Sequence, residues 1–486
     1  MAFPPRNKKA VELAQRKNRR YRILLAGEQG GGGGAAPTLE SNMHERWVFT
    51  YQTGAAGLGG NNLWDSWTRT GTNATSRGSD GYITSYAANI PRYEYDENLD
   101  LLGLLMEPAK TEYVGTSQTV LSAANGYTAN LCTYTANDHT GNPESAATTC
   151  DTFADLNDGT ADAVYINKTA SFPSTSNVTL SCFVKLVDAG TSGTCYVALQ
   201  LASMTSVSAT AFFNLSTGAK GSSVGAQLKE YEIIPYNDGW YRIFLTSSTS
   251  TDTSAAIRLN ITDADLNQST YTTDGKKIAT WGWQIEETIS QHAFGPTSFA
   301  IGNRSEDFPG LASITGWYTD QGTGISFYAQ SCNYHMTEEG TSPYVAMYDS
   351  FSDWYGLDKA TSTLQAQIAT TTGTDATDNS TSPIDPAFLL EERRAVASFA
   401  NNDVFACSQQ DTVGSITPVT SATYPITNIP ISIRLNVRSG GLTYDTGSGR
   451  ILQELIIYNT NLTETEAVDL CTNGATNGAP NRTAPA

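Results

Sequence analysis

From Trp47 onward the chain alternates short runs of β-branched and aromatic residues with clusters of Gly, Asn, Asp, Ser and Thr. Within the runs, apolar and polar positions alternate, which is typical of strands that bury one face. Five clear examples are 163–166, 178–184, 195–199, 241–245 and 255–259. Evenly spaced strands separated by turn-forming residues predict an all-β fold of antiparallel β-sandwich or jelly-roll type.

Helical periodicity is scarce. We expect a short basic helix within 7–25, one helical turn at 387–397 and another at 463–471. Thr463 and Glu466 have the spacing of a capping box, in which a threonine and a glutamate three residues later satisfy backbone N–H groups at a helix start. A helix is therefore predicted to begin at this point.

Two stretches, 111–300 and 301–472, each have the size of one sandwich domain. The first ends in a predicted strand, 279–286, in which Trp281 and Trp283 are expected to share a face because side chains alternate with period two. The second ends in a predicted strand at 449–459. We expect 35–110 to be an extended connecting region and 473–486 to be a flexible tail.

The first 34 residues differ from the rest. The net charge of the chain is −19, yet residues 1–22 carry a charge of +7, which leaves −26 for the remainder. Five consecutive glycines follow at 30–34. We interpret 1–34 as a basic helical arm on a Gly-rich linker. The basic residues of the arm are Arg6, Lys8, Lys9, Arg16, Lys17, Arg19, Arg20 and Arg22.

Three uses of the arm compete. Docking onto an acidic partner protein is favoured, because a tethered arm raises its effective concentration without constraining the domains. Nucleic-acid binding is disfavoured, because the strongly acidic remainder would be repelled by phosphates. A solvated terminus without a partner is the third interpretation.

Membrane insertion and export are not expected. The longest apolar run near the N-terminus, 23–26, is too short for a signal-peptide core, and no window approaches the roughly 20 apolar residues of a membrane span. The seven cysteines form no CxxC pair, so a zinc site is not expected. Cys132 with Cys150, and Cys182 with Cys195, have the spacing of short disulfide loops, but an odd number of cysteines favours reduced, buried thiols.

Several segments between 67 and 111 resemble a signature of tailed-phage virion proteins. They include Asp80-Gly81-Tyr82-Ile83, then Asn89-Ile90-Pro91-Arg92-Tyr93-Glu94-Tyr95-Asp96, and Gly103-Leu104-Leu105-Met106-Glu107. In those proteins this stretch precedes a jelly roll of carbohydrate-binding-module type, which the segments 238–242 and 281–286 resemble. The final strand and helix, 454–466, resemble the end of a concanavalin-like or laminin-G-like sandwich.

The resemblance implies a virion structural protein of tail-fibre type that assembles in the host cytoplasm. It would be anchored to other virion proteins by its arm, form a homotrimer, and project sandwiches that bind host surface glycans. A capsid decoration or head-fibre protein without a receptor is one alternative. A tailspike enzyme that depolymerises polysaccharide is another.

We expect no enzyme. The acid pairs Glu286/Glu287, Glu338/Glu339, Glu391/Glu392 and Asp353/Asp358 do not have a convincing catalytic arrangement, because adjacent acids on a strand point to opposite faces. The four histidines lie apart, and none is near a Gly-x-Ser-x-Gly motif.

Two binding sites are candidates. Asp155, Asn157, Asp158 and Asp162 crowd oxygen atoms that suit Ca²⁺, although Asn-Asp-Gly clusters more often form a hairpin turn. Trp317, Tyr318, Trp354 and Tyr355 are the aromatic residues chosen as a glycan platform. Gly356 places the latter pair in a turn, and core packing is the competing interpretation for all such aromatic residues.

Overall fold

The computed structural model describes the regions from which the fold is built. These are residues 43–48, 74–87, 90–96, 98–107, 110–114, 121–173, 177–203, 208–248, 252–267, 271–286, 302–304, 310–311, 324–333, 342–348, 354–360, 363–370, 373–379, 392–400, 403–409, 432–435, 450–458 and 462–473. Every strand pairing among them that joins named strands is antiparallel. The fold is all-β, as predicted.

The first sandwich consists of an eight-stranded and a six-stranded sheet. The eight-stranded sheet runs β15-β16-β11-β18-β6-β19, with β9 on β18 and β8 on β9. Its strands are β6 (Lys110–Glu112), β8 (Cys132–Asn142), β9 (Ser145–Asp155), β11 (Asn177–Ala189), β15 (Leu228–Pro235), β16 (Trp240–Ser248), β18 (Lys276–Glu286) and β19 (Gly302–Arg304).

The six-stranded sheet runs β14-β13-β12-β17-β10-β7. Its strands are β7 (Thr128–Asn130), β10 (Val164–Ser171), β12 (Tyr196–Ala202), β13 (Ala209–Asn214), β14 (Ala219–Val224) and β17 (Ser254–Thr262). Alternate residues of both sheets, such as Val184, Leu199 and Ile257, meet in one buried core. The five strand segments taken as examples from the sequence all lie in this sandwich and all form strands, which confirms those predictions.

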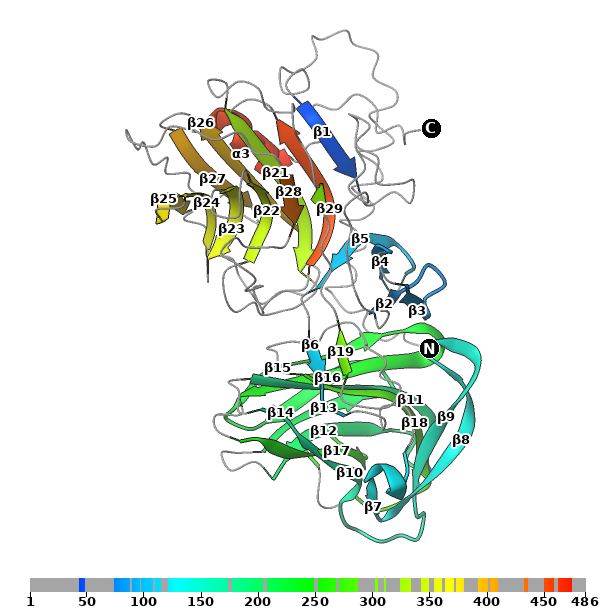
Figure 1. The fold of residues 1–486 in the computed structure, drawn as a ribbon. Coiled ribbons are helices and arrows are strands. Elements are labelled where there is room, and N and C mark those ends of the chain that lie inside the picture. Colours follow the sequence, from blue (N-terminus) through cyan, green and yellow to red (C-terminus); the bar gives the residue numbers. More distant parts are fainter. Residues whose placement is uncertain are drawn as a thin grey trace, which may run out of the picture.

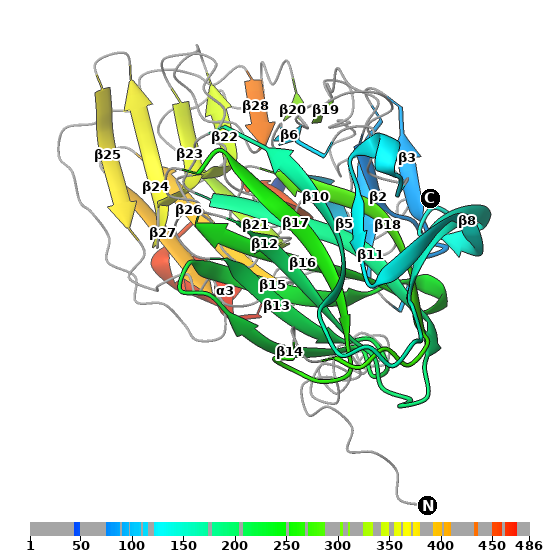
Figure 2. The same cartoon turned by 90° about the horizontal axis from the view of Figure 1, so that it is seen from below.

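The second sandwich also has two sheets. The seven-stranded sheet runs β27-β26-β21-β29-β5-β4, with β1 on β29, and the six-stranded sheet runs β20-β28-β22-β23-β24-β25. The seven-stranded sheet contains β1 (Met43–Val48), β4 (Arg92–Tyr95), β5 (Leu101–Met106), β21 (Ile325–Asn333), β26 (Glu392–Ala400), β27 (Asp403–Gln409) and β29 (Arg450–Tyr458). The other contains β20 (Gly310–Leu311), β22 (Ser342–Tyr348), β23 (Trp354–Ala360), β24 (Thr363–Thr370), β25 (Gly373–Asn379) and β28 (Ser432–Leu435). In Figure 2, β25, β24 and β23 follow one another across the sheet.

Helix α3 (Glu464–Asn473) covers one face of the seven-stranded sheet. Its residues Ala467, Leu470 and Cys471 pack with Tyr328 and Ile456. The predicted capping box is confirmed, because the Thr463 N–H donates to Glu466 Oε2 at 2.9 Å and the Glu466 N–H donates to Thr463 Oγ1 at 3.3 Å. Within the described residues, no helix is both long enough and apolar enough to cross a membrane.

The helical turn predicted at 387–397 is wrong. Residues 392–400 form strand β26, which is hydrogen-bonded to β21 on one side and β27 on the other. Residues 395–399 are all buried there. Pairing on both sides and burial outweigh the helix propensity of this Glu-, Arg- and Ala-rich segment.

The two tryptophans of β18 do not share a face, so this prediction is also wrong. Trp283 lies in the main core, whereas Trp281 packs on Phe183 in a separate cluster, with ring centroids 5.7 Å apart. The register of β18 on β11 shifts between Ser181 and Phe183, and Gly282 has a φ of 63°. This bulge inserts one extra residue and reverses the alternation of side chains.

Five cysteines, Cys132, Cys150, Cys182, Cys195 and Cys471, are buried and free. This confirms the prediction of reduced thiols at these positions. Burial raises the pKa of Cys132, Cys150 and Cys195 to about 12. These thiols are therefore protonated near neutral pH and are poor nucleophiles.

Strands β2 (Ala74–Arg77) and β3 (Ile83–Tyr86) form a separate hairpin. Together with β4 and β5 it makes up the linking module, which we define as residues 74–107. Figure 1 shows β2–β5 between the two sandwiches. The region predicted to connect the domains, 35–110, therefore contains ordered strands, three of which (β1, β4 and β5) join the sheet of the second sandwich.

Candidate functional site

Some of the predicted site residues lie outside the part of the chain that the structure describes. These are the basic residues of the arm and Trp317 with Tyr318. For Trp354 and Tyr355 the structure describes the backbone. They are the first two residues of strand β23 and pair with Tyr348 and Met347 of β22. The predicted turn is wrong, because Gly356 continues the strand and pairs with both neighbours. The glycan-binding role of these residues stays a prediction.

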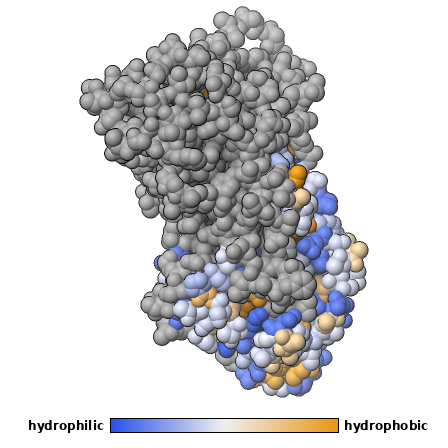
Figure 3. Space-filling model, viewed as in Figure 1, coloured by the Kyte–Doolittle hydropathy of each residue, from blue (hydrophilic) through white to orange (hydrophobic). Residues whose placement is uncertain are grey.

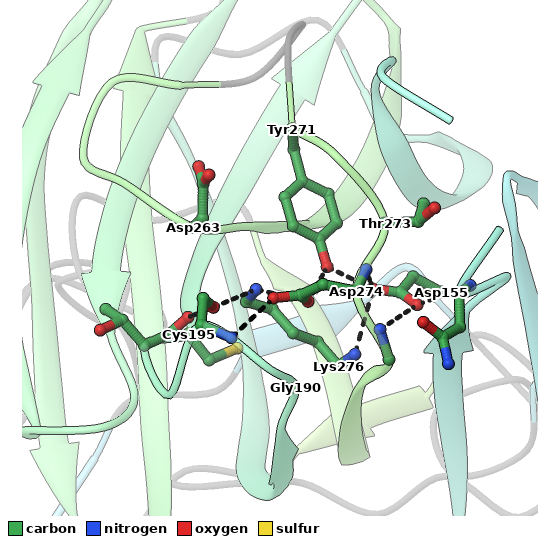
Figure 4. A network of polar contacts seen from close by, with 12 residues as sticks. Asp155, Gly190, Cys195, Asp263, Tyr271, Thr273, Asp274 and Lys276 are labelled. Carbon is green, nitrogen blue, oxygen red and sulfur yellow. Dashed lines mark hydrogen bonds and ion pairs between the residues drawn. The ribbon is translucent and has the colours of Figure 1, made fainter. Parts of the chain in front are cut away.

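Asp155 is the centre of a polar network at one end of the first sandwich (Figure 4). Its carboxylate accepts four backbone N–H groups, from Asn157 at 2.9 Å, Asp274 at 3.1 Å, Gly275 at 2.9 Å and Lys276 at 3.0 Å. It is only 6% exposed. One side chain therefore fixes the turn after β9 and the turn before β18.

A tyrosine and a lysine extend this network. The Tyr271 hydroxyl donates to Asp155 Oδ2 and, at 2.7 Å, to Asp274 Oδ1. Burial, followed by these bonds to two carboxylates, raises the pKa of Tyr271 far above its ordinary value. Lys276 Nζ lies 2.6 Å from Asp274 Oδ1 and 2.8 Å from Ser192 Oγ, and its side chain is fully buried. Figure 4 shows these side chains pointing toward one another.

The predicted calcium ligands are used differently. Asp158 Oδ1 accepts from the Thr160 N–H and from the Thr273 hydroxyl, and Asp162 Oδ1 accepts from the Ala163 N–H. Across the part of the chain that the structure describes, no group of three or more His, Cys, Asp or Glu residues is placed to hold a metal ion. The ammonium group of Lys276 pairs with Asp274, which was not among the predicted ligands.

Strands β4 and β5 of the linking module are joined by a buried ion pair. Arg92 Nη1 lies 2.8 Å from Glu107 Oε2, and neither side chain is exposed. The same nitrogen donates to the Thr75 carbonyl at 2.7 Å. Because a buried charge requires a partner and further hydrogen bonds, this pair fixes β2, β4 and the end of β5 relative to one another.

The linking module contacts both sandwiches. On one side β5 pairs with β29, and a Cβ at Gly103, where φ is 143°, would lie 2.4 Å from the Leu452 carbonyl oxygen. Only glycine allows this approach. On the other side the Arg77 guanidinium donates to the Pro235 carbonyl and lies 3.7 Å from the centre of the Tyr236 ring.

The hairpin β2–β3 adds further contacts to the first sandwich. Tyr82 donates to Asp238 at 2.7 Å, and the Ile83 N–H donates to the Pro143 carbonyl at 2.7 Å. Ile83 is buried together with Trp240 and Trp281. The hairpin is therefore packed onto this sandwich by apolar as well as polar contacts.

Glu94 is the second buried acid of the linking module. It accepts from the Arg77 N–H at 3.1 Å and is 4% exposed. Burial raises the pKa of Glu94 to about 7, although the positive charge of Arg77 opposes the shift. Folding therefore favours the protonated form of this carboxyl group.

A polar face lies on the outer side of the six-stranded sheet. Core residues such as Leu199 and Leu259 point inward, so their neighbours point outward. Strand register aligns one row across five neighbouring strands, and this row consists of Thr210, Gln200, Arg258, Asn167 and Thr128. We define the polar face as this row together with Tyr165, Tyr196 and Asn260.

The side chains of this face differ in their exposed fraction. On this side of the sheet Ala198, Thr210, Phe212 and Asn260 are buried, whereas Tyr165, Asn167, Tyr196, Gln200 and Arg258 are half-buried. Tyrosine rings, amides and a guanidinium group are the residue types that recognise sugars, because rings stack on pyranoses and amides bind hydroxyls. The surface of this sandwich seen in Figure 3 mixes hydrophilic and hydrophobic residues.

The polar face was not predicted from the sequence. The sequence signal was the type of the outward-facing residues. In 164–170, 196–202 and 255–261 they include Tyr165, Asn167, Tyr196, Gln200, Arg258 and Asn260. Their assembly on one surface depends on the order β12-β17-β10, which brings together segments far apart in the sequence.

No protein-family model and no curated protein sequence matches this chain. Three solved structures are similar over part of it. The NanB sialidase from Streptococcus pneumoniae has 10% identity and a TM-score of 0.26, covering 33% of this chain and 25% of the sialidase. The botulinum neurotoxin serotype D/C binding domain has 8% identity and a TM-score of 0.27, covering 35% of this chain and 42% of that domain.

The third is the LG1-3 region of the laminin alpha2 chain, with 9% identity and a TM-score of 0.24, covering 63% of this chain and 67% of that region. The chain thus spans less than half the length of the sialidase and of the toxin domain. At these TM-scores the likenesses carry no argument about function.

The first prediction concerns Glu94. Its stabilising contribution is fully present below the unfolded pKa near 4.5 and is lost as the pH rises through about 7. Glu94→Gln keeps an acceptor for the Arg77 N–H but cannot ionise, so its melting temperature will depend less on pH across this window. Melting curves of both proteins from pH 4.5 to pH 8 test this. Glu232→Gln, at a surface ion pair, is the control for loss of one charge, and identical profiles for wild type and Glu94→Gln would contradict the assignment.

The second prediction concerns Asp155. Asp155→Ala leaves four backbone N–H groups without their acceptor, so it should destabilise the first sandwich by about 3 kcal/mol or more. Asp162→Ala, at an exposed residue whose carboxylate accepts from the N–H of the adjacent Ala163, should change stability by less than ~0.5 kcal/mol. Thermal melts measure both effects. A chelator should leave the wild-type melting temperature unchanged, and a calcium-dependent rise would restore the metal-site interpretation.

Proposed function

We propose that this chain is a non-enzymatic structural protein of a tailed-phage particle, held there by its N-terminal arm and binding a glycan through the polar face. The observation that carries the virion assignment is the Arg92–Glu107 pair. It accounts physically for why the phage-like segment needs an arginine after its proline and a glutamate after its Leu-Leu-Met run. The resemblance therefore rests on residues that hold the linking module together.

The proposed architecture assigns different tasks to different parts. The basic arm docks onto acidic surfaces of neighbouring virion proteins, and the Gly-rich linker separates it from the folded regions. The chain assembles as a homotrimer in the host cytoplasm. The two sandwiches, joined by the linking module, project from the particle.

The glycan-binding part of the proposal rests on the polar face. Tyr165 and Tyr196 are half-buried rings on a surface that otherwise carries amides and an arginine. A sugar bound there would stack on a ring and exchange hydrogen bonds with Asn167 and Gln200. Nothing in this arrangement requires a reacting group, which fits binding rather than hydrolysis.

Particle assembly tests the arm. Deleting residues 1–34 should leave the melting temperature unchanged and abolish incorporation into particles, because the arm carries the docking contacts. Mass spectrometry of purified particles measures incorporation, and cryo-electron microscopy of intact particles distinguishes a tail from a head position. A variant with the eight basic residues of the arm replaced by glutamine separates the effect of charge from that of length. Full incorporation of the truncated chain would refute the anchor.

Binding to host cells tests the polar face. Tyr196→Ala should weaken binding roughly 10-fold, the loss expected when one stacked ring is removed. Tyr82→Ala is the matched control, because Tyr82 is a half-buried tyrosine on the linking module. Labelled protein on host cells, measured by flow cytometry, gives the affinities. Equal binding by wild type and Tyr196→Ala, with unchanged melting temperatures, would remove Tyr196 from the site.

A further inference from the structure

Arg258 is the positively charged residue of the polar face, and two neighbouring side chains fix its orientation. Its Nε donates to Asn167 Oδ1 at 3.1 Å, and its guanidinium carbon lies 4.8 Å from the centre of the Tyr165 ring. The hydrogen bond and the ring fix the plane of the guanidinium group. Its terminal nitrogens make no hydrogen bond to any residue that the structure describes, so the edge that binds carboxylates is available.

Arg258 forms no ion pair with any residue that the structure describes. The guanidinium groups of Arg77 and Arg242 are likewise held by an uncharged acceptor and an aromatic ring, whereas four other cations are paired with acids. Arg92 pairs with Glu107, Lys220 with Glu232, Lys276 with Asp274, and Lys277 with Asp138.

We propose that the polar face binds an acidic saccharide, whose sugar carboxylate is held by Arg258. This inference rests on the proposed glycan-binding function and specifies its ligand class. Arginine binds a carboxylate through two parallel N–H···O bonds, which fixes both the position and the plane of the acid. The neighbouring amides of Asn167 and Gln200, opposite Arg258 in the strand register, are placed to bind the ring hydroxyls.

The strand register also gives the distance between Arg258 and Tyr196 of the polar face. Tyr196 lies on the strand next to Arg258 and four residues further along, since it pairs with Thr262. With ~3.4 Å per residue and ~4.8 Å between strands, their Cα atoms are roughly 14 Å apart. This separation corresponds to the length of two to three sugar units.

A glycan array tests the inference. The probes are saccharides of two to three units that carry glucuronate, galacturonate or sialate, each printed beside its neutral, carboxyl-reduced counterpart. Full-length wild-type protein should bind acidic probes, and comparison of the uronate probes with the sialate probes shows which acid supplies the carboxylate. Arg258→Gln should lose roughly 10- to 100-fold in affinity for the bound acidic probes. Lys220→Gln, which removes one charge from the edge strand β14 of the same sheet, should bind like the wild type.

The outcomes separate the two proposals. If neutral and acidic probes bind equally, or if Arg258→Gln binds acidic probes like the wild type, the acidic-sugar inference is overturned while glycan binding stands. If no probe binds although the protein binds host cells through Tyr196, the saccharide class is wrong. If no probe binds and the cell assay is negative as well, both proposals fail. Melting curves confirm that each variant is folded.

Discussion

The buried pair Arg92–Glu107 is the interaction on which the arrangement of the chain depends. Removing one partner of such a pair leaves an uncompensated charge in the interior, which typically costs ~3–5 kcal/mol. The pair therefore permits only structures in which β2, β4 and β5 stay together. Since β5 extends the seven-stranded sheet and the β2–β3 hairpin packs on the first sandwich, this single constraint links both sandwiches.

Sequence patterns predicted the strands well where one periodicity was uninterrupted. Segments such as 178–184 alternate cleanly, and their core-facing residues follow directly from this alternation. The pattern failed at Trp281 and Trp283, because a bulge depends on the register with β11 and not on the residues of β18 alone. It failed again at 392–400, where local propensity favours a helix and two neighbouring strands impose pairing.

Candidate sites were harder to predict, because their partners are distant in sequence. The cluster at 155–162 shows that oxygen atoms gather there, but the donors that use Asp155 come from 271–276. Likewise Asn167 and Arg258 are 91 positions apart and meet only through the pairing of β10 with β17. Glu94 and Glu107 look alike in the sequence, yet Glu107 pairs with Arg92, whereas burial favours protonation of Glu94.

The surroundings of Arg258 differ from those of Arg92 and Lys276. Arg92 and Lys276 are buried and paired with acids of the same chain, so their interactions are complete once the protein folds. Arg258 is equally well oriented, by Tyr165 and Asn167, but this orientation satisfies only one of its nitrogens. Ordering an arginine side chain costs conformational entropy whether or not an acid is bound. A guanidinium group that is ordered in advance loses less on binding, and this preorganisation is what a site for a carboxylate requires.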